Sequence, residues 1–292
     1  MFSGSLVAIV TPMRPDGAVD YDAWARLLEF HAENGSAGVV VGGTTGESAT
    51  LSDAELHELT VRACTHSRGR LAVIAGAGTS STASTVARVE WLSRLPIDGL
   101  LIVTPAYNRP PQEGLFRHFA AAAAAASKPV VLYNVPTRTA VDLKPATVAR
   151  LARVPGIVGL KEAVPESARV RELCALCGSD FVVLSGDDAS AREVIAAGAR
   201  GVISVTANVA PSLMSQMVTA AVAGRSEEAR ALDAPLAGLH RELFVEANPI
   251  PVKWLLGQMG LIPPGVRLPL TPLAEEHHEA VRAAARAAGA LN

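Results

Sequence analysis

The sequence predicts an α/β fold, a (β/α)8 TIM barrel with a C-terminal helical extension. Short apolar runs recur at regular intervals, and segments with apolar residues at helical spacing separate them. Each run is nearly continuous in apolar residues, so both faces of the strand are expected to be buried, as in a parallel sheet. Eight such strands alternating with helices describe a sheet that closes on itself. The runs occupy residues 6–10, 37–41, 71–75, 99–103, 130–133, 156–160, 181–184 and 201–205.

Local signals mark several of the intervening helices. Residues 24–31 carry apolar side chains at helical spacing, and Gly35 follows them as a candidate C-cap. Ser52 and Glu55 form a capping-box pattern that predicts a helix start after the second strand. Residues 120–126 are all alanine, which favours a helix rather than a linker.

Residues 1–224 are predicted to form the barrel and residues 225–292 the extension. Helical patterns continue at 227–244, 252–259 and 274–288, and no Gly/Ser-rich or charge-rich linker precedes them, so the extension is expected to pack on the barrel. A doubly wound open sheet is the alternative fold. It is disfavoured because Thr-Pro-Met-Arg, rather than a glycine-rich dinucleotide fingerprint, follows the first strand.

Composition favours a soluble, cytoplasmic protein that acts on small molecules. The 292 residues include 26 basic and 28 acidic side chains, so there is no basic field to attract nucleic acid or an anionic membrane. No basic leader precedes the first apolar run, and no run reaches the ~18 apolar residues of a membrane span. The three cysteines are too few for a disulfide framework, and we interpret Cys174 and Cys177 as helical thiols rather than a redox or metal site.

Lys161 is the leading catalytic candidate. It follows the apolar run 156–160, so it lies at the carboxyl end of a predicted strand, where barrel enzymes place their catalytic groups. A free lysine, with a pKa near ~10.4, is almost fully protonated at neutral pH, whereas desolvation that lowers the pKa to roughly 7–8 makes a Schiff-base nucleophile. Taken alone, a lysine that extends into solvent or pairs with a carboxylate is an equally good interpretation.

The second strand leads into GGTTGES at residues 42–48. Its glycines allow close backbone approach, and consecutive N–H groups there can bind an anion, with the hydroxyls of Thr44 and Thr45 beside them. A carboxylate fits better than a phosphate because the segment lacks the lysine and the length of a Walker loop. An ordinary glycine-rich turn is the alternative.

Two of the three tyrosines lie at or just beyond the carboxyl ends of predicted strands. Tyr107 follows the fourth strand and Tyr133 ends the fifth, positions that suit proton transfer better than packing. Arg138 follows Tyr133 closely and offers the planar fork that binds a carboxylate through two hydrogen bonds. Core tyrosines and a solvated loop arginine are the alternatives for each residue taken alone.

A catalytic metal is not expected. The seven histidines fall mostly in predicted helices, away from the strand ends. Asp187 and Asp188 follow the seventh strand and could attract a cation, but we expect them to accept hydrogen bonds from the loop backbone.

Six motifs, in this order and spacing, resemble the dihydrodipicolinate synthase family: GGTTGES, YNVPTRT, GLKEA, LSGDDAS, GVISVTAN and FVEANPIPVKW. The resemblance runs from Gly4 to Pro269, essentially the whole chain. It implies a barrel with carboxy-terminal helices, assembled as a homotetramer that is a dimer of dimers. It also implies a lyase that condenses pyruvate with L-aspartate 4-semialdehyde on the route to diaminopimelate and lysine, without a cofactor.

The resemblance also implies roles for individual residues. Lys161 would form the imine with pyruvate, and Tyr133 would donate and accept protons. Thr44 would link Tyr133 to Tyr107, which in the family reaches in from the neighbouring subunit.

Three further residues would bind the substrates. Thr45 would hold the carboxylate of pyruvate, Ile203 would contribute a backbone contact, and Arg138 would receive the carboxylate of the semialdehyde. The nearest rivals, N-acetylneuraminate lyase and the 2-keto-3-deoxy-sugar acid aldolases, tend to have serine at the position of Thr44 and to lack the arginine of Arg138. A non-catalytic pyruvate-binding scaffold is the rival from another class, and the complete catalytic set disfavours it.

The chain departs from the lysine-inhibited members of the family at five positions. Where those members carry His, His, Asn, Glu and Tyr, this sequence has Asp53, Leu56, Ser80, Ser84 and Ala106. The resemblance therefore implies insensitivity to lysine. Ala106 also removes a ring that helps to pack the tight dimer in relatives.

Overall fold

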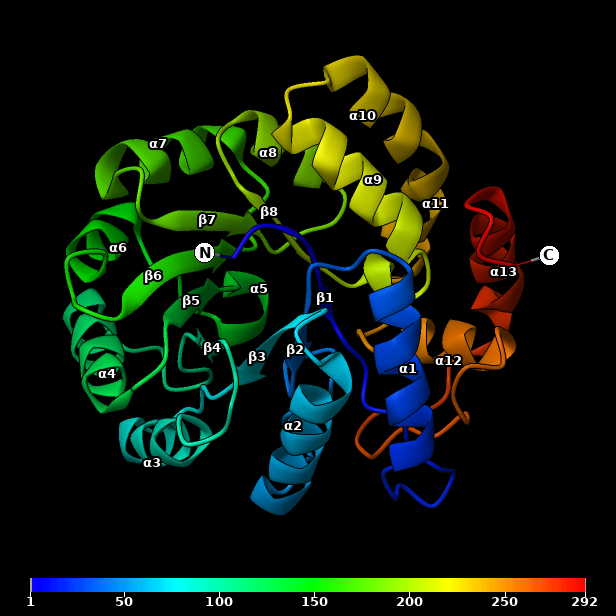
Figure 1. Ribbon diagram of the computed structural model, residues 1–292, viewed down its shortest axis with the longest axis horizontal. Coiled ribbons are helices and arrows are strands. Elements are labelled where there is room, and N and C mark those ends of the chain that lie inside the picture. The colour runs from blue at the N-terminus through cyan, green and yellow to red at the C-terminus, as the bar shows by residue number, and fades with distance from the viewer. Residues whose placement is uncertain (1, 292) are drawn as a thin grey trace.

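The computed structural model describes residues 2–291, and in this range the chain forms a closed barrel of parallel strands in sequential order, as predicted (Figure 1). β1 pairs with both β2 and β8, which closes the sheet. The sixth strand runs past the predicted end and includes Lys161 and Glu162. The strands are β1 (Gly4–Ala8), β2 (Gly38–Val41), β3 (Ala72–Gly76), β4 (Gly99–Val103), β5 (Val130–Asn134), β6 (Ile157–Glu162), β7 (Val182–Ser185) and β8 (Gly201–Ser204).

A ring of helices surrounds the strands (Figure 1). The capping box at the start of α2 is confirmed, because the Ser52 side chain and the Glu55 side chain each bond the other's backbone N–H. A single helical turn, α5 (Pro136–Thr139), follows β5 directly. The longer helices are α1 (Tyr21–Glu33), α2 (Asp53–Ser67), α3 (Thr82–Leu92), α4 (Gln112–Ala125), α6 (Pro145–Leu151), α7 (Ser167–Cys177), α8 (Ala191–Ala196) and α9 (Pro211–Val222).

The core has two parts because successive side chains of a strand point to opposite faces of the sheet. One cluster fills the barrel interior and includes Leu6, Ile74 and Ile203. Tyr133 belongs to the same cluster and lies near the carboxyl end of β5. The other cluster lies between the sheet and the helices and contains Trp24 and Phe119 among its largest side chains. Any site at the carboxyl ends of the strands is therefore bounded on its inner side by this interior cluster.

The C-terminal extension contacts the barrel through α10, which packs against α9, and through α12, which meets the 3-10 turn Thr206–Asn208 after β8. The helical pattern predicted at 227–244 is confirmed as two helices, and a 3-10 turn (Ala234–Leu236) separates α10 from α11. The reason is Pro235, which has no backbone N–H and cannot continue an α-helix. The division at residue 224 stays a prediction. The helices of the extension are α10 (Ser226–Asp233), α11 (Ala237–Glu242), α12 (Ile250–Gln258) and α13 (His278–Ala287).

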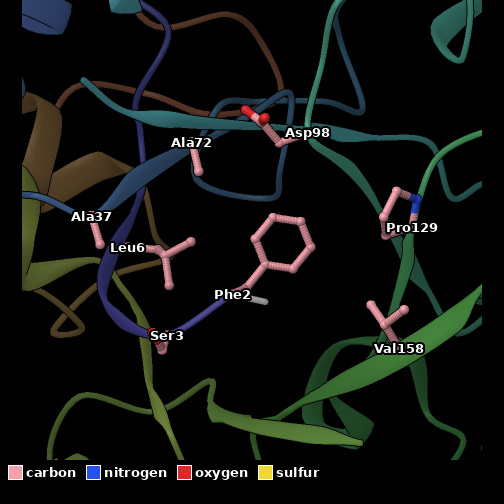
Figure 2. Close-up of a pocket in the computed structure, with 8 residues that line it drawn as sticks. All are labelled: Phe2, Ser3, Leu6, Ala37, Ala72, Asp98, Pro129 and Val158. Atoms are coloured by element: carbon pink, nitrogen blue, oxygen red, sulfur yellow. The ribbon is translucent and has the colours of Figure 1, made fainter. Parts of the chain in front are cut away.

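A cavity of about 640 Å³ lies at the amino ends of the strands, where Ala37, Ala72 and Pro129 line it. Figure 2 shows the ring of Phe2 projecting into its centre. Gly99 leaves room for this ring, since a Cβ there would lie 2.5 Å from the Phe2 Cζ atom. Barrel enzymes work at the opposite end of the strands, so we assign this cavity to packing.

Candidate active site

The carboxyl ends of the strands surround a second cavity, of about 280 Å³. Five of the seven predicted site residues line it, namely Thr44, Thr45, Tyr133, Arg138 and Lys161. These residues come from three separate parts of the chain: the loop after β2, the β5–α5 junction and the end of β6. The structure therefore brings most of the predicted site together at the end of the barrel that barrel enzymes use.

Lys161 and Tyr133 face each other across adjacent strands. They are register partners in the β5–β6 pair, and the Nζ atom of Lys161 lies 4.3 Å from the centroid of the Tyr133 ring. Only 5% of Lys161 and 7% of Tyr133 are exposed, and within residues 2–291 the lysine forms no ion pair. Neither alternative interpretation of Lys161, an extension into solvent or a carboxylate pair, describes this geometry.

The loop after β2 is a tight turn that presents Thr44 and Thr45. Gly42 has a φ of +63°, which favours glycine, and a Cβ there would lie 2.4 Å from the Cδ1 atom of Leu56 and would displace that side chain. The backbone N–H groups of Gly46 and Ser48 both donate to the carbonyl of Gly43, at 3.1 and 3.3 Å. These two donors are therefore used within the turn, and an anion-binding role for the other N–H groups of the loop stays a prediction.

Asn248 is a cavity residue that the sequence reasoning did not single out. It lies before α12 in the C-terminal extension, and its Nδ2 donates to the Thr45 Oγ1 at 2.9 Å. Its Oδ1 is buried and, within residues 2–291, has no hydrogen-bond partner. The available signal was the FVEANPIPVKW motif, which contains this residue and Phe244, another cavity residue.

A second buried lysine lies close to the site and has a different setting. Lys253 of α12 forms an ion pair with Glu47, and the two side chains are 2% and 1% exposed. Burial lowers the pKa of the Lys253 ammonium, and the Glu47 carboxylate opposes this shift. The backbone N–H of Arg267 donates to the other Glu47 oxygen at 3.1 Å. Through Glu47, both Lys253 and Arg267 therefore connect the C-terminal extension to the β2 loop.

Arg138 lies at the mouth of the cavity. Pro136 occupies the first position of α5, where its fixed φ and missing N–H suit the start of a helical turn. The turn carries Arg138 over the cavity that contains Lys161, with its side chain exposed to solvent. A flexible, solvated guanidinium at this position can receive an anionic group that enters from outside.

Two predicted site residues do not line the cavity. Tyr107 is 94% exposed and has a φ of +73°, so the loop after β4 holds its ring away from its own barrel. Ile203 lies on β8 with its side chain buried in the interior cluster. The roles of both residues stay predictions.

The aspartates after β7 behave as expected. One oxygen of Asp188 accepts hydrogen bonds from the backbone N–H groups of Val205 and Thr206, at 2.8 and 2.9 Å. Asp187 accepts from the N–H and the hydroxyl of Ser190, at 2.9 and 2.7 Å. In the described part of the chain, no three His, Cys, Asp or Glu side chains are grouped so that they could hold a metal ion.

The C-x-x-C pair lies on α7, in agreement with its interpretation as two helical thiols. Cys174 and Cys177 are free thiols, and burial raises the pKa of both, to about 11 for Cys177. A thiol with a raised pKa carries little thiolate at neutral pH and is a poor nucleophile or metal ligand.

A closed (β/α)8 barrel with a buried lysine against a tyrosine, at the carboxyl ends of adjacent strands, has the arrangement of barrel enzymes that work through a lysine nucleophile. The model of the Dihydrodipicolinate synthetase family matches residues 1–288. The chain belongs to this family.

Relatives with the same length of chain agree. The 4-hydroxy-tetrahydrodipicolinate synthases of Methylococcus capsulatus and Alkalilimnicola ehrlichii are each 52% identical over 291 residues, with full coverage of both chains. Among solved structures, the chloride-inhibited dihydrodipicolinate synthase of Acinetobacter baumannii, in complex with pyruvate, has a TM-score of 0.98 at 45% identity and full coverage of both chains. No helix within residues 2–291 has the length and apolar character needed to cross a membrane.

Proposed function

We propose that this protein is a lyase that condenses pyruvate with L-aspartate 4-semialdehyde through a Schiff base on Lys161. The product is 4-hydroxy-tetrahydrodipicolinate, an intermediate on the route to diaminopimelate and lysine. The observation that carries the proposal is the buried lysine against the Tyr133 ring at the barrel mouth, in a chain 52% identical to synthases of this name. No cofactor is required, because the imine itself activates pyruvate.

The reaction begins at Lys161. Its unprotonated Nζ attacks the C2 carbonyl of pyruvate to form a carbinolamine, and loss of water gives the imine. Tyr133, whose ring lies beside the Lys161 Nζ, would pass the proton that the carbinolamine oxygen needs in order to leave as water. Loss of a proton from the pyruvate methyl group then gives an enamine, whose carbon attacks the aldehyde of the second substrate. The amino group of that substrate then attacks the imine carbon, which closes the ring and breaks the bond to Lys161, so that the lysine leaves as a free amine.

Two side chains would hold the carboxylates of the substrates. Thr45 is buried, and its hydroxyl, which accepts from Asn248, can donate its own proton to the carboxylate of pyruvate. Arg138 at the mouth would receive the carboxylate of the semialdehyde. Ile203 would add a backbone contact from β8.

Tyr107 supports a proposal about assembly. A ring that is 94% exposed, on a backbone with positive φ, is unfavourable for an isolated chain. We propose that Tyr107 enters the site of a neighbouring subunit and there connects with Thr44 and Tyr133, within a homotetramer built as a dimer of dimers. Its place of action would be the cytoplasm.

Reductive trapping tests the proposal directly. Borohydride with pyruvate should add one pyruvate-derived unit per chain at Lys161, as mass spectrometry of the peptide would show. Lys253 is a matched internal control, because it is equally buried but paired with Glu47. Labelling at Lys253, or inactivation without added mass at Lys161, would overturn the assignment.

A coupled assay then separates the synthase from its rivals. We expect turnover with pyruvate and L-aspartate 4-semialdehyde and none with N-acetylneuraminate in the same preparation. Trapping at Lys161 together with cleavage of N-acetylneuraminate would keep the Schiff base but assign the protein to the N-acetylneuraminate lyases.

A further inference from the structure

The pairing of β5 with β6 contains an irregularity below the catalytic pair. Val130 is the register partner of Ile157, but the next residue, Val131, is the partner of Gly159, so one residue of β6 is skipped. In a sheet, a shift of one residue moves a side chain to the other face. The position of Lys161 opposite Tyr133 therefore depends on what fixes the register beyond the bulge.

A side-chain bridge lies one residue beyond the catalytic pair. Asn134 and Glu162 are the next register partners, and their side chains meet on the outer face of the sheet. The Nδ2 of Asn134 donates to the two Glu162 oxygens at 2.9 and 3.2 Å. Both side chains are buried, so water does not compete for these hydrogen bonds.

The remaining polar atoms of the bridge are also bonded. The Asn134 Oδ1 accepts from the Leu143 N–H at 2.9 Å, and the Glu162 Oε1 accepts from the Val164 N–H at 2.9 Å. Arg169 of α7 donates from Nε to Glu162 at 2.8 Å. The bridge is thus held in one orientation by groups from two loops and a helix.

An outer contact completes the cluster. Asp142 accepts from Arg169 at 2.7 Å and from Asn134 at 2.8 Å, and its side chain is partly exposed. Stability alone does not call for this arrangement, because a well-packed apolar pair is often as stable as a buried ionic group. Buried polar groups do specify register, since only one alignment satisfies their donors and acceptors.

We propose that Asn134 and Glu162 are positioning residues, whose bridge behind the barrel wall fixes the β5–β6 register that places Tyr133 against Lys161. They touch no substrate and act only through their neighbours in sequence. The inference deepens the proposed function and rests on it, because it concerns the geometry of imine formation at Lys161.

Breaking the bridge provides the test. Asn134→Asp places two acceptors opposite each other and breaks the bridge. Asp142→Asn is the matched control, because it weakens the contact with Arg169 but leaves the bridge. If Asn134→Asp is insoluble, Asn134→Leu breaks the same bridge without adding a charge.

The readout is the rate of reductive trapping at saturating pyruvate, with the KM for pyruvate and the unfolding temperature measured alongside. The broken bridge should slow trapping about 10- to 100-fold, since small misplacements of reacting groups have effects of this size. The KM should change little, because Thr45 is untouched. The Asp142→Asn variant should stay within about twofold of wild type.

Two outcomes would overturn the inference: trapping at the wild-type rate in a folded Asn134→Asp or Asn134→Leu variant, or an equal loss in Asp142→Asn. Failure of the proposed function is a separate result, because it would appear in the wild-type protein as absence of label on Lys161.

Discussion

Lys253→Met removes the cation of the buried Glu47–Lys253 pair while keeping a side chain of similar length. The Glu47 carboxylate would then retain one hydrogen bond, from the Arg267 N–H at 3.1 Å, in a position where its side chain is only 1% exposed. The pair joins the β2 loop to α12, so the change also loosens the attachment of the extension.

The magnitude follows from the burial of both partners. Removal of one partner from a buried ion pair destabilises a protein by about 3–5 kcal/mol, because the other charge stays buried without compensation. At roughly 2–3 °C per kcal/mol for a chain of this size, the unfolding temperature should fall by about 6–15 °C. The double variant Glu47→Gln/Lys253→Met has no buried charge at this place and should recover much of the loss.

Urea unfolding of the three proteins, at one fixed protein concentration, measures the effect. The fixed concentration is necessary because an oligomer gains apparent stability from mass action. A loss below about 1 kcal/mol in Lys253→Met would refute the reasoning, since it would place this pair in the range of exposed ion pairs. A double variant no more stable than the single one would refute it as well.

Four other outcomes are expected. Arg138→Ala should lower kcat/KM for the semialdehyde about 10- to 150-fold, the value of a charged hydrogen bond, while trapping of pyruvate persists. Tyr107→Phe should lower the rate about 10²- to 10⁴-fold, and mixing it with Tyr133→Phe subunits should restore part of the activity if the site is shared. L-lysine at about 1 mM should not inhibit, because a loss of ~4 kcal/mol at the five altered positions weakens binding roughly 1,000-fold. The hydrogen bond from Arg267 lowers the pKa of Glu55 from 4.5 to about 2. The wild-type protein should therefore be more stable than Glu55→Gln above pH 4.5, and this difference in unfolding free energy should disappear as the pH falls towards 2.

Each of these expectations has a contrary result. Equal loss of pyruvate trapping in Arg138→Ala would assign that residue to the pyruvate site or to folding. Absence of recovery after confirmed subunit exchange would mean that each chain carries its own proton relay. Half-inhibition by L-lysine at or below about 1 mM would mean that the effector pocket has been rebuilt from other residues. A difference between wild type and Glu55→Gln that stays constant with pH would mean that the carboxylate is not bonded in the native state.

The sequence was sufficient for the barrel and for the lysine. Strands buried on both faces must be apolar along their whole length, so the runs were visible without any knowledge of contacts. A cation directly after such a run stands out for the same reason, and this placed Lys161 at the mouth of the barrel. The break at Pro235 was equally local and could have been predicted, because proline cannot continue a helix.

The tertiary structure decided what depends on contacts between distant residues. Asn248 and Thr45 are 203 positions apart, and Lys253 and Glu47 are 206 apart, so no periodicity relates them. Whether the Gly43 carbonyl accepts the hydrogen bonds of the Gly46 and Ser48 N–H groups depends on how the turn closes. The local pattern of apolar and polar residues indicates only whether a residue faces the core or the solvent. The closure of the whole barrel decides which buried partner a residue contacts and in which register the strands pair.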